Sequence, residues 1–402
     1  MRILFIAGGS AATVFALAPL ATAARNAGHE VFMAANDDMA PVITGMGLSA
    51  VRAGAEPLSR FVYADRAGRP ATIPSGPAEQ ASYLGVFHAR MAAAWLPVLA
   101  EMTADWRPDV LVAGTLAYAG PLLAARLGIP WVRHTWDAIE AWEADVGAER
   151  ELTAELAELG LGVLPPADLL LEVCPPSLLP PKSLPAERTV PLRWVPANGQ
   201  CAIEPWMYQR GVRPRICLTA GSRVARREQH DGERDYRQVS LEFLHSAGAK
   251  ILALDAELLV AVPEQAAVGL REALGSRAHV GWMPLDIVAR HCDLILHNGG
   301  GVTSMTALSA GLPQIVLPQG PVQVSAACRV AAYGAASVLL PGDDGPESVA
   351  DACQTMLSTP SYAERAGAIA AEIASLPGPA EVLEAVADLA AVPASGETHV
   401  HA

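Results

Sequence analysis

Charged side chains are scarce in this chain of 402 residues, in which Asp, Glu, Lys and Arg make up 17% and apolar residues 51%. So little charge excludes a chain that is disordered throughout and predicts compact globular domains. Basic residues are the scarcer sign, 28 against 42 acidic residues, which gives a formal charge of −14. We therefore expect neither nucleic acid nor an anionic membrane as a partner.

Paired cysteines and long apolar runs are also missing. The six cysteines are scattered without a CxxC pair, which predicts neither a zinc site nor a disulfide framework. A single basic residue, Arg2, precedes the first strand-like segment, and this is not a signal-peptide pattern. No uninterrupted apolar run reaches the length that spans a membrane. The expectation is a cytoplasmic protein of two or three domains.

Strand-like and helix-like segments alternate along the whole chain, which is typical of βαβ units and a parallel sheet. In the first half, residues 2–7 and 30–35 are expected strands around a helix that ends at Gly28. The second half repeats the scheme from residue 215 onward. We expect an α/β fold with two Rossmann-like domains that face each other across a cleft.

The expected boundaries follow from this alternation, with residues 175–205, which are rich in proline, separating the halves as a linker region. Two polar stretches rich in Gly or Pro, 54–80 and 140–162, are expected to be long binding loops. The domains expected are an N-terminal domain (1–198), a linker (199–213), a C-terminal domain (214–375), a helix returning to the N-terminal domain (376–391) and a disordered tail (392–402).

The most informative segment is residues 293–319, DLILHNGGGVTSMTALSAGLPQIVLPQ. It places His297 and three glycines between a strand and a helix, where backbone N–H groups and the helix N-terminus point at an anion. A histidine and a hydroxyl at the same place suit a diphosphate. The alternative, a dinucleotide site at the N-terminus, is weaker, because AGGSAAT lacks the third glycine of GxGxxG and Asp37 follows it too soon.

Together with GWMPLDIV (281–288), this segment resembles the donor-binding region of GT-B glycosyltransferases of natural-product pathways, which commonly show GWxP, HHGGxGT, AGxPQ and a distal Gln. FALAPLATAARNAGHEV (15–31) and LGIPWVRHTWD (127–137) extend the resemblance into the first half. Within that family, ATVFALAPL and EPWMY are most similar to the urdamycin-type C-glycosyltransferases of aromatic polyketide pathways, which attach D-olivose.

The resemblance implies that Trp282 stacks on a thymine or uracil base and that His297 donates to the diphosphate. Asn298 and Val302 depart from the family motif, and Val322 replaces an Asp, which fits a deoxygenated sugar. The implied donor-binding residues are Thr219, Gly221, Ser222, Arg223, Trp282, Pro284, His297, Gly299, Gly300, Gly301, Thr303 and Gln323.

On the acceptor side, O-glycosyltransferases of this family usually have a His three residues before the Pro of the first helix, where this chain has Ala16. A general base must therefore come from elsewhere or be unnecessary. Asp137 is the expected catalytic base with His297 as the second catalytic residue, and a helix cap is the other reading of Asp137. The expected acceptor-binding residues, of which the aromatic ones are equally compatible with core packing, are Ser10, Phe61, Tyr83, Phe87, His134, Trp136 and Trp142.

No DxD motif follows an expected strand, so we expect no metal site and no cofactor besides the co-substrate. The predicted reaction moves an olivose-like deoxyhexose from a dTDP-sugar to a phenolic, apolar aromatic polyketide, with inversion and a carbon–carbon bond. O-glycosyl transfer, a non-catalytic protein that only binds the nucleotide sugar, and a GT-B epimerase are the alternatives. A homodimer is one assembly that the sequence permits.

Overall fold

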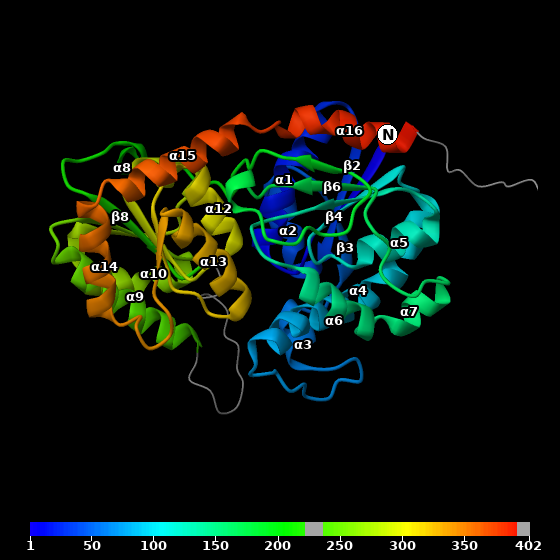
Figure 1. Cartoon of the computed structure of the whole chain (residues 1–402), viewed down its shortest axis with the longest axis horizontal. Helices are drawn as coiled ribbons and strands as arrows, with labels where there is room; N and C mark the ends of the chain where they lie inside the picture. The colour runs from blue at the N-terminus through cyan, green and yellow to red at the C-terminus, as the bar shows by residue number, and fades with distance from the viewer. Residues whose placement is uncertain (222–235, 392–402) are drawn as a thin grey trace, which may run out of the picture.

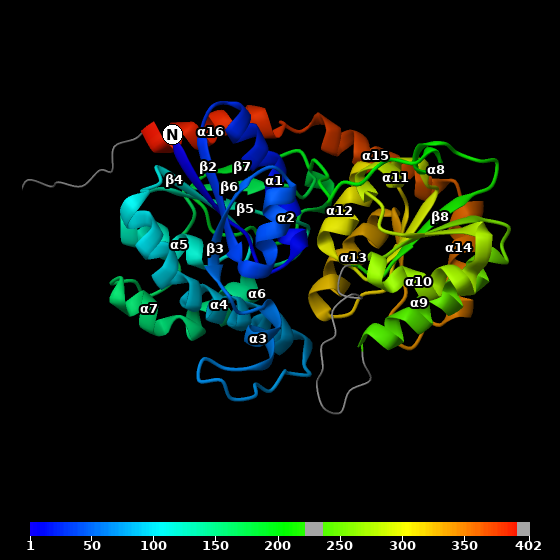
Figure 2. The same cartoon turned by 180° about the vertical axis from the view of Figure 1, so that it is seen from behind.

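The computed structural model describes residues 1–221 and 236–391. Two parallel sheets, each covered by helices, lie side by side, and the last helices of the chain run across the junction between them (Figures 1 and 2). The expectation of two Rossmann-like domains with a GT-B arrangement is confirmed.

The N-terminal half is built on a seven-stranded parallel sheet in the order β3-β2-β1-β4-β5-β6-β7. The central strands are buried on both faces, which explains their continuous apolar sequence. The strands are β1 (Arg2–Ile6), β2 (Glu30–Asn36), β3 (Ser49–Gly54), β4 (Val110–Gly114), β5 (Trp131–His134), β6 (Leu169–Glu172) and β7 (Thr189–Pro191).

Helix α4 is the longest helix of this half and packs closely against α6. A Cβ added to Gly85 would lie 1.7 Å from the Ala144 carbonyl oxygen, so only glycine permits this crossing. By length and composition alone α4 could cross a membrane, but half of its most apolar window is buried inside this fold. The helices are α1 (Ala11–Asn26), α2 (Ala40–Gly45), α3 (Leu58–Tyr63), α4 (Pro77–Asp105), α5 (Ala119–Leu127), α6 (Trp142–Glu151) and α7 (Thr153–Glu158).

The C-terminal half has a six-stranded parallel sheet in the order β10-β9-β8-β11-β12-β13. Its strands are β8 (Arg215–Thr219), β9 (Glu257–Ala261), β10 (Ala278–Gly281), β11 (Leu294–His297), β12 (Gln314–Val316) and β13 (Ala336–Val338). Its helices are α8 (Pro205–Tyr208), α9 (Tyr236–Leu252), α10 (Glu264–Leu274), α11 (Leu285–Val288), α12 (Gly301–Ser309), α13 (Pro321–Tyr333), α14 (Pro346–Ser358) and α15 (Ser361–Ser375).

The halves are joined by apolar packing and by two crossings of the chain. Met305 on α12 and Val330 on α13 belong to the same apolar cluster as the core of the N-terminal half. The final helix, α16 (Pro379–Ala391), packs on α1. The two crossings touch, because the Arg193 N–H donates to the Pro377 carbonyl at 2.8 Å.

Two expectations about loops are wrong. The proline-rich region 175–205 is not all linker, since β7 pairs with β6 inside it. The stretch 140–162 is mostly helical, because it contains α6 and α7, and the stretch 54–80 contains α3 and the start of α4. The tail 392–402 lies outside the described residues, and the predicted domain boundaries stay predictions.

Candidate active site

The site forms where the carboxyl ends of β5 and β11 face each other across the two halves. Asp137 follows β5, and Gly301 is the first residue of α12, after β11 and the glycine turn. A Cβ built on Gly301 would lie 1.9 Å from Asp137 Oδ2, so the carboxylate sits directly against the glycine backbone. The fold thus brings the expected base into contact with the expected phosphate-holding loop.

Asp137 is only partly accessible to solvent, and this burial raises its pKa from 3.8 to about 7. The Ile139 N–H donates to Asp137 Oδ1 at 3.0 Å, and this bond lowers the pKa. The negative charge of Glu172 raises the pKa of Asp137, and the positive charge of Arg329 lowers it. The next helix, α6, begins only at Trp142, so the helix-cap alternative for Asp137 is wrong. At neutral pH this carboxyl can therefore both accept and release a proton.

Glu172, which the sequence analysis missed, is a second buried carboxyl group beside Asp137. It accepts hydrogen bonds from the Thr135 hydroxyl at 2.8 Å and from the Cys174 N–H at 2.9 Å. Burial raises its pKa. The available sequence signal was its place: it ends the apolar strand β6 and so faces the same edge of the sheet as Asp137.

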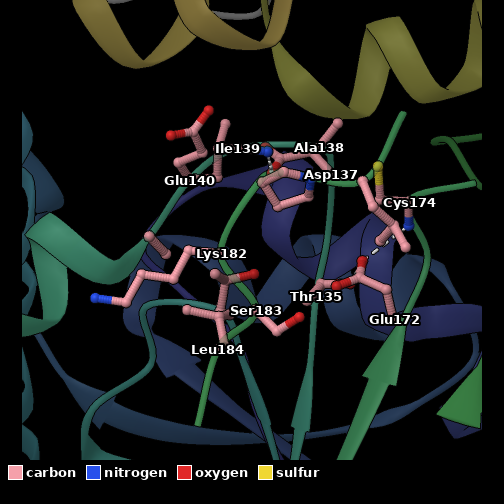
Figure 3. A pocket seen from close by; sticks show the side chains of 14 residues that line it. Thr135, Asp137, Ala138, Ile139, Glu140, Glu172, Cys174, Lys182, Ser183 and Leu184 are labelled. Atoms are coloured by element: carbon pink, nitrogen blue, oxygen red, sulfur yellow. Dashed lines mark hydrogen bonds between the residues drawn. The ribbon is translucent and has the colours of Figure 1, made fainter. Parts of the chain in front are cut away.

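Asp137 and Glu172 line a recess of about 410 Å³, open solvent included (Figure 3). One wall is the end of the sheet with Thr115, and the opposite wall is the segment 179–184. The Lys182 ammonium of that segment lies over the Trp142 ring, 4.3 Å from its centroid. Trp142, one of the aromatic residues expected to bind the acceptor, therefore lies beside a residue that lines this recess.

The other expected acceptor residues belong to the N-terminal half and do not line this recess. Tyr83 and Phe87 pack edge to face on α4, with ring centroids 6.0 Å apart, and the Tyr83 hydroxyl donates to the Val62 carbonyl. Ser10 precedes α1, with its carbonyl bonded to the Thr13 hydroxyl. Phe61 and Trp136 are buried core residues, which is the alternative that the sequence allowed for the aromatic side chains. His134 is also buried.

His134 is a poor candidate for a base because burial lowers its pKa to about 4. Its Nδ1 bonds to the Thr135 carbonyl, which fixes the ring inside the protein. Trp136 packs against Gly114, where an added Cβ would lie 2.5 Å from the indole. Both residues support the strand end that carries Asp137, and neither supplies the proton acceptor.

His297 is buried, and both of its ring nitrogens have partners inside the protein. Nε2 donates to Gln314 Oε1 at 2.8 Å, and Nδ1 accepts the Gly299 N–H at 3.1 Å. Burial lowers its pKa to about 4, against a smaller opposing effect of the Gln314 bond, so the ring is neutral at pH 7. In this arrangement His297 holds Gly299 in its left-handed conformation (φ +78°), and its direct donation to a diphosphate stays a prediction.

The first turn of the C-terminal half lies beside the glycine turn. The Thr219 hydroxyl donates to the Ala261 carbonyl at 2.7 Å and accepts the Gly221 N–H at 3.1 Å. The Asn298 side chain donates to the Ala220 carbonyl at 3.0 Å, which ties the two turns together. The expected donor residues Ser222 and Arg223 lie outside the described residues.

A second recess, of about 350 Å³ with open solvent included, lies under the glycine turn and across to the N-terminal half. Gln323 from α13 packs against Gly299, so close that an added glycine Cβ would lie 2.9 Å from Gln323 Cβ. The N-terminal half contributes Ala138 and Ile139, the residues directly after Asp137. This recess joins Gln323, one of the expected donor-binding residues, to the loop of the expected base.

The remaining donor candidates surround this region. Trp282 is 39% exposed, and its indole N–H donates to the Gly199 carbonyl at 2.9 Å. Pro284 precedes α11, while Gly300 precedes α12, whose first turn carries Thr303. The open N–H groups of that first turn suit an anion. No group of three metal-ligating side chains occurs in residues 1–221 and 236–391, and metal independence stays a prediction.

Two family profiles match the chain. Residues 22–221 match "Erythromycin biosynthesis protein CIII-like, N-terminal domain", and residues 246–389 match "Erythromycin biosynthesis protein CIII-like, C-terminal domain". The L-demethylnoviosyl transferase of Streptomyces niveus is 32% identical over 96% of this chain and 98% of its own. The aclacinomycin-T 2-deoxy-L-fucose transferase of Streptomyces galilaeus is 29% identical over 97% of this chain and 96% of its own.

Solved structures show the same likeness. The Streptomyces sp. SF2575 glycosyltransferase SsfS6, complexed with thymidine diphosphate, superposes with a TM-score of 0.82 at 31% identity, over 96% of this chain and 99% of its own. The similarity therefore extends over both halves and includes the cleft between them.

Proposed function

Because the chain belongs to the EryCIII-like family of GT-B glycosyltransferases, we propose that it moves a deoxyhexose from a dTDP-sugar to a phenolic aromatic polyketide. The proposed transfer proceeds with inversion, joins the sugar to a ring carbon, needs no metal ion, and serves antibiotic biosynthesis in the cytoplasm. The class, a nucleotide-sugar-dependent glycosyltransferase, follows from the family. The sugar, the phenolic acceptor, the linkage, the inversion, the independence of metal and the cytoplasmic location are the proposed parts.

The choice of donor is supported by the relatives and by the turn at α12. SsfS6 has thymidine diphosphate bound, and the Streptomyces galilaeus relative carries 2-deoxy-L-fucose in its name. Here, the glycine backbone and the first N–H groups of α12 provide a place for the diphosphate, and helix-end dipoles stabilise negative charge there. Val322, in place of the family's Asp, removes a polar contact that a sugar with fewer hydroxyl groups does not need.

One observation carries the mechanism: the carboxylate of Asp137 touches Gly301, the first residue of α12. A sugar whose diphosphate occupies that turn would hold its anomeric carbon close to this carboxylate. The phenol proton passes to Asp137, and the phenolate's ortho or para carbon attacks the anomeric carbon as the bond to the diphosphate breaks. The ring then loses the proton from the attacked carbon and regains its aromaticity, while the oxygen takes back the proton held by Asp137. The products are a phenolic C-glycoside, dTDP and one proton, and Asp137 is again a carboxylate.

The acidity of Asp137 favours a phenol over an aliphatic alcohol as the acceptor. General-base catalysis works best when the base has a pKa near the working pH, and burial raises that of Asp137 to about 7. A phenol ionises near pH 10, like tyrosine, so the two groups differ by about three units. Helix α1 has no histidine, and Ala16 at the family's usual His position is 4% exposed.

The test is a product analysis with dTDP-deoxysugars and polyhydroxylated anthraquinone- or tetracycline-type acceptors. We expect a product that keeps its sugar in hot acid and has lost one aromatic proton by NMR. Asp137→Asn should abolish it while His134→Gln, a nearby change outside the proposed chemistry, tests for damage to the strand end. A sugar released by acid would show O-transfer, and dTDP binding without any product would show a non-catalytic protein.

A further inference from the structure

Arg329 on α13 links the donor side of the cleft to the loop that carries Asp137. The same helix places Gln323 on the second recess. Arg329 donates from one Nη to the Glu140 carboxylate and from the other to the Ala138 carbonyl. Its Nε donates to the Leu178 carbonyl at 3.2 Å. One side chain thus holds residues 138–140, which line the first recess, and Leu178, which directly precedes the lining segment 179–184.

Glu140 is the partner that makes this link specific. Its Oε1 also accepts the Ser325 hydroxyl of α13 at 2.6 Å, so two residues one helical turn apart grip the same carboxylate. In Figure 3 the Glu140 carboxylate points out of the recess toward the helices of the C-terminal half. The Arg329 side chain is 18% exposed and the Glu140 side chain 27%, so the pair is only partly screened by water.

We propose that Arg329 is a positioning residue for the transfer reaction: by binding residues 138–140 and 178, it places Asp137 against the glycine turn only when the two halves are closed. The proposal rests on the proposed function, since it concerns how the base of that reaction is placed. The chain's own geometry supports it, because the loop between Asp137 and α6 bonds to α13 through Arg329 at a carbonyl and a carboxylate at once.

A lysine cannot replace this arginine in full. The guanidinium group is planar and donates in three directions here, whereas an ammonium group is a point charge on a flexible stem. Arg329→Lys therefore keeps the charge but loses the fixed geometry, and Arg329→Gln loses both. The two variants separate placement of the loop from the effect of charge on Asp137.

The charge effect has a definite sign. The groups that act on Asp137 are Glu172 at the end of β6, the N-terminus of α12, and Arg329 on α13, while Cys174 lies beside Glu172. The positive charge of Arg329 lowers the pKa of Asp137 and the negative charge of Glu172 raises it. Removing the Arg329 charge should therefore move the acidic limb of the kcat/KM profile to higher pH.

The experiment compares wild type, Arg329→Gln and Arg329→Lys, with Arg277→Gln as the control. Arg277 also bonds to a carbonyl, that of Leu252, but within the C-terminal half. We expect kcat at pH 7 to fall by about 100-fold in Arg329→Gln, as for a misplaced reacting group, while calorimetric affinity for dTDP stays within about twofold. Arg329→Lys should also lose kcat but keep the wild-type acidic limb.

A second readout does not depend on turnover. By small-angle X-ray scattering in saturating dTDP, Arg329→Gln should have a larger radius of gyration than wild type and Arg277→Gln. Equal radii together with an unchanged kcat and acidic limb would overturn the inference and leave the proposed function standing. If wild type forms no glycoside, the proposed function fails, and a larger radius in Arg329→Gln would keep Arg329 as the group that holds the halves closed.

Discussion

Replacing Asp137 with asparagine should change how the stability of the protein depends on pH. In the folded state, burial raises the pKa of Asp137 from 3.8 to about 7. Above pH 7 the folded protein therefore holds a charge in poor contact with water, which the unfolded chain would expose. Below pH 4 the carboxyl group is neutral in both states, and its ionisation no longer affects the free energy of unfolding.

The size of the effect follows from the shift. Each pKa unit corresponds to about 1.4 kcal/mol, so three units give at most about 4 kcal/mol. Between pH 4 and 7 the unfolded chain binds fewer protons than the folded protein, so the wild-type free energy of unfolding falls with rising pH relative to Asp137→Asn. The limit is an upper one because Asp137 keeps some access to solvent. Asparagine can still accept the Ile139 N–H, so that bond does not obscure the comparison.

The assay is urea unfolding of wild type, Asp137→Asn and a surface control, Asp388→Asn on the exposed face of α16, at pH 5, 6, 7 and 8. We expect the variant to gain stability over wild type as pH rises and to level off above pH 7. A difference between the two proteins that stays constant from pH 5 to 8 would refute the raised pKa. It would also remove the reason to regard Asp137 as a base tuned to neutral pH, whatever the acceptor is.

Three further changes test the site and its support. Gly301→Ala places a methyl group 1.9 Å from Asp137 Oδ2, so turnover should fall by about 100-fold in a transfer assay, and wild-type turnover would contradict the contact. Trp282→Ala should weaken calorimetric dTDP binding by about tenfold if the indole stacks on the base, and unchanged affinity would exclude that role. Arg133→Met leaves Asp145 of the buried ion pair without its partner charge and should lower the free energy of unfolding by about 3–5 kcal/mol. The double variant Arg133→Met/Asp145→Leu should recover most of this loss in the same urea assay.

The sequence predicted the two sheets well because buried parallel strands have a simple pattern. Strands such as β4 and β11 are continuous apolar runs that end at a polar or glycine residue. The polar stretch 140–162 was misassigned because the buried face of α6 consists of small residues, Ala144, Gly147 and Ala148, rather than large apolar ones. This face is buried only because it packs closely on α4. Such packing between distant segments leaves no hydrophobic periodicity in the sequence of α6.

The site was predictable where a residue's place on a strand decides its position. Asp137 follows a strand closely and His297 ends one, so both had to lie at the carboxyl edges of their sheets. Whether His297 faces a ligand or Gln314 depends on side-chain rotation, which the motif does not encode. Arg329 and Glu140 could not be paired from the sequence, because their contact exists only once the two halves have docked.

The contact between Arg193 and Pro377 has a consequence for movement. The polypeptide passes between the halves twice, and this hydrogen bond shows that the two passages lie next to each other rather than at opposite ends of the junction. Two adjacent passages favour a swing of the halves about one shared pivot, in which the far edge of the cleft travels most. Product could leave and substrate could enter by this swing alone. Because the two halves stay linked at the pivot, each remains at a high effective concentration relative to the other, so the cleft can close again rapidly.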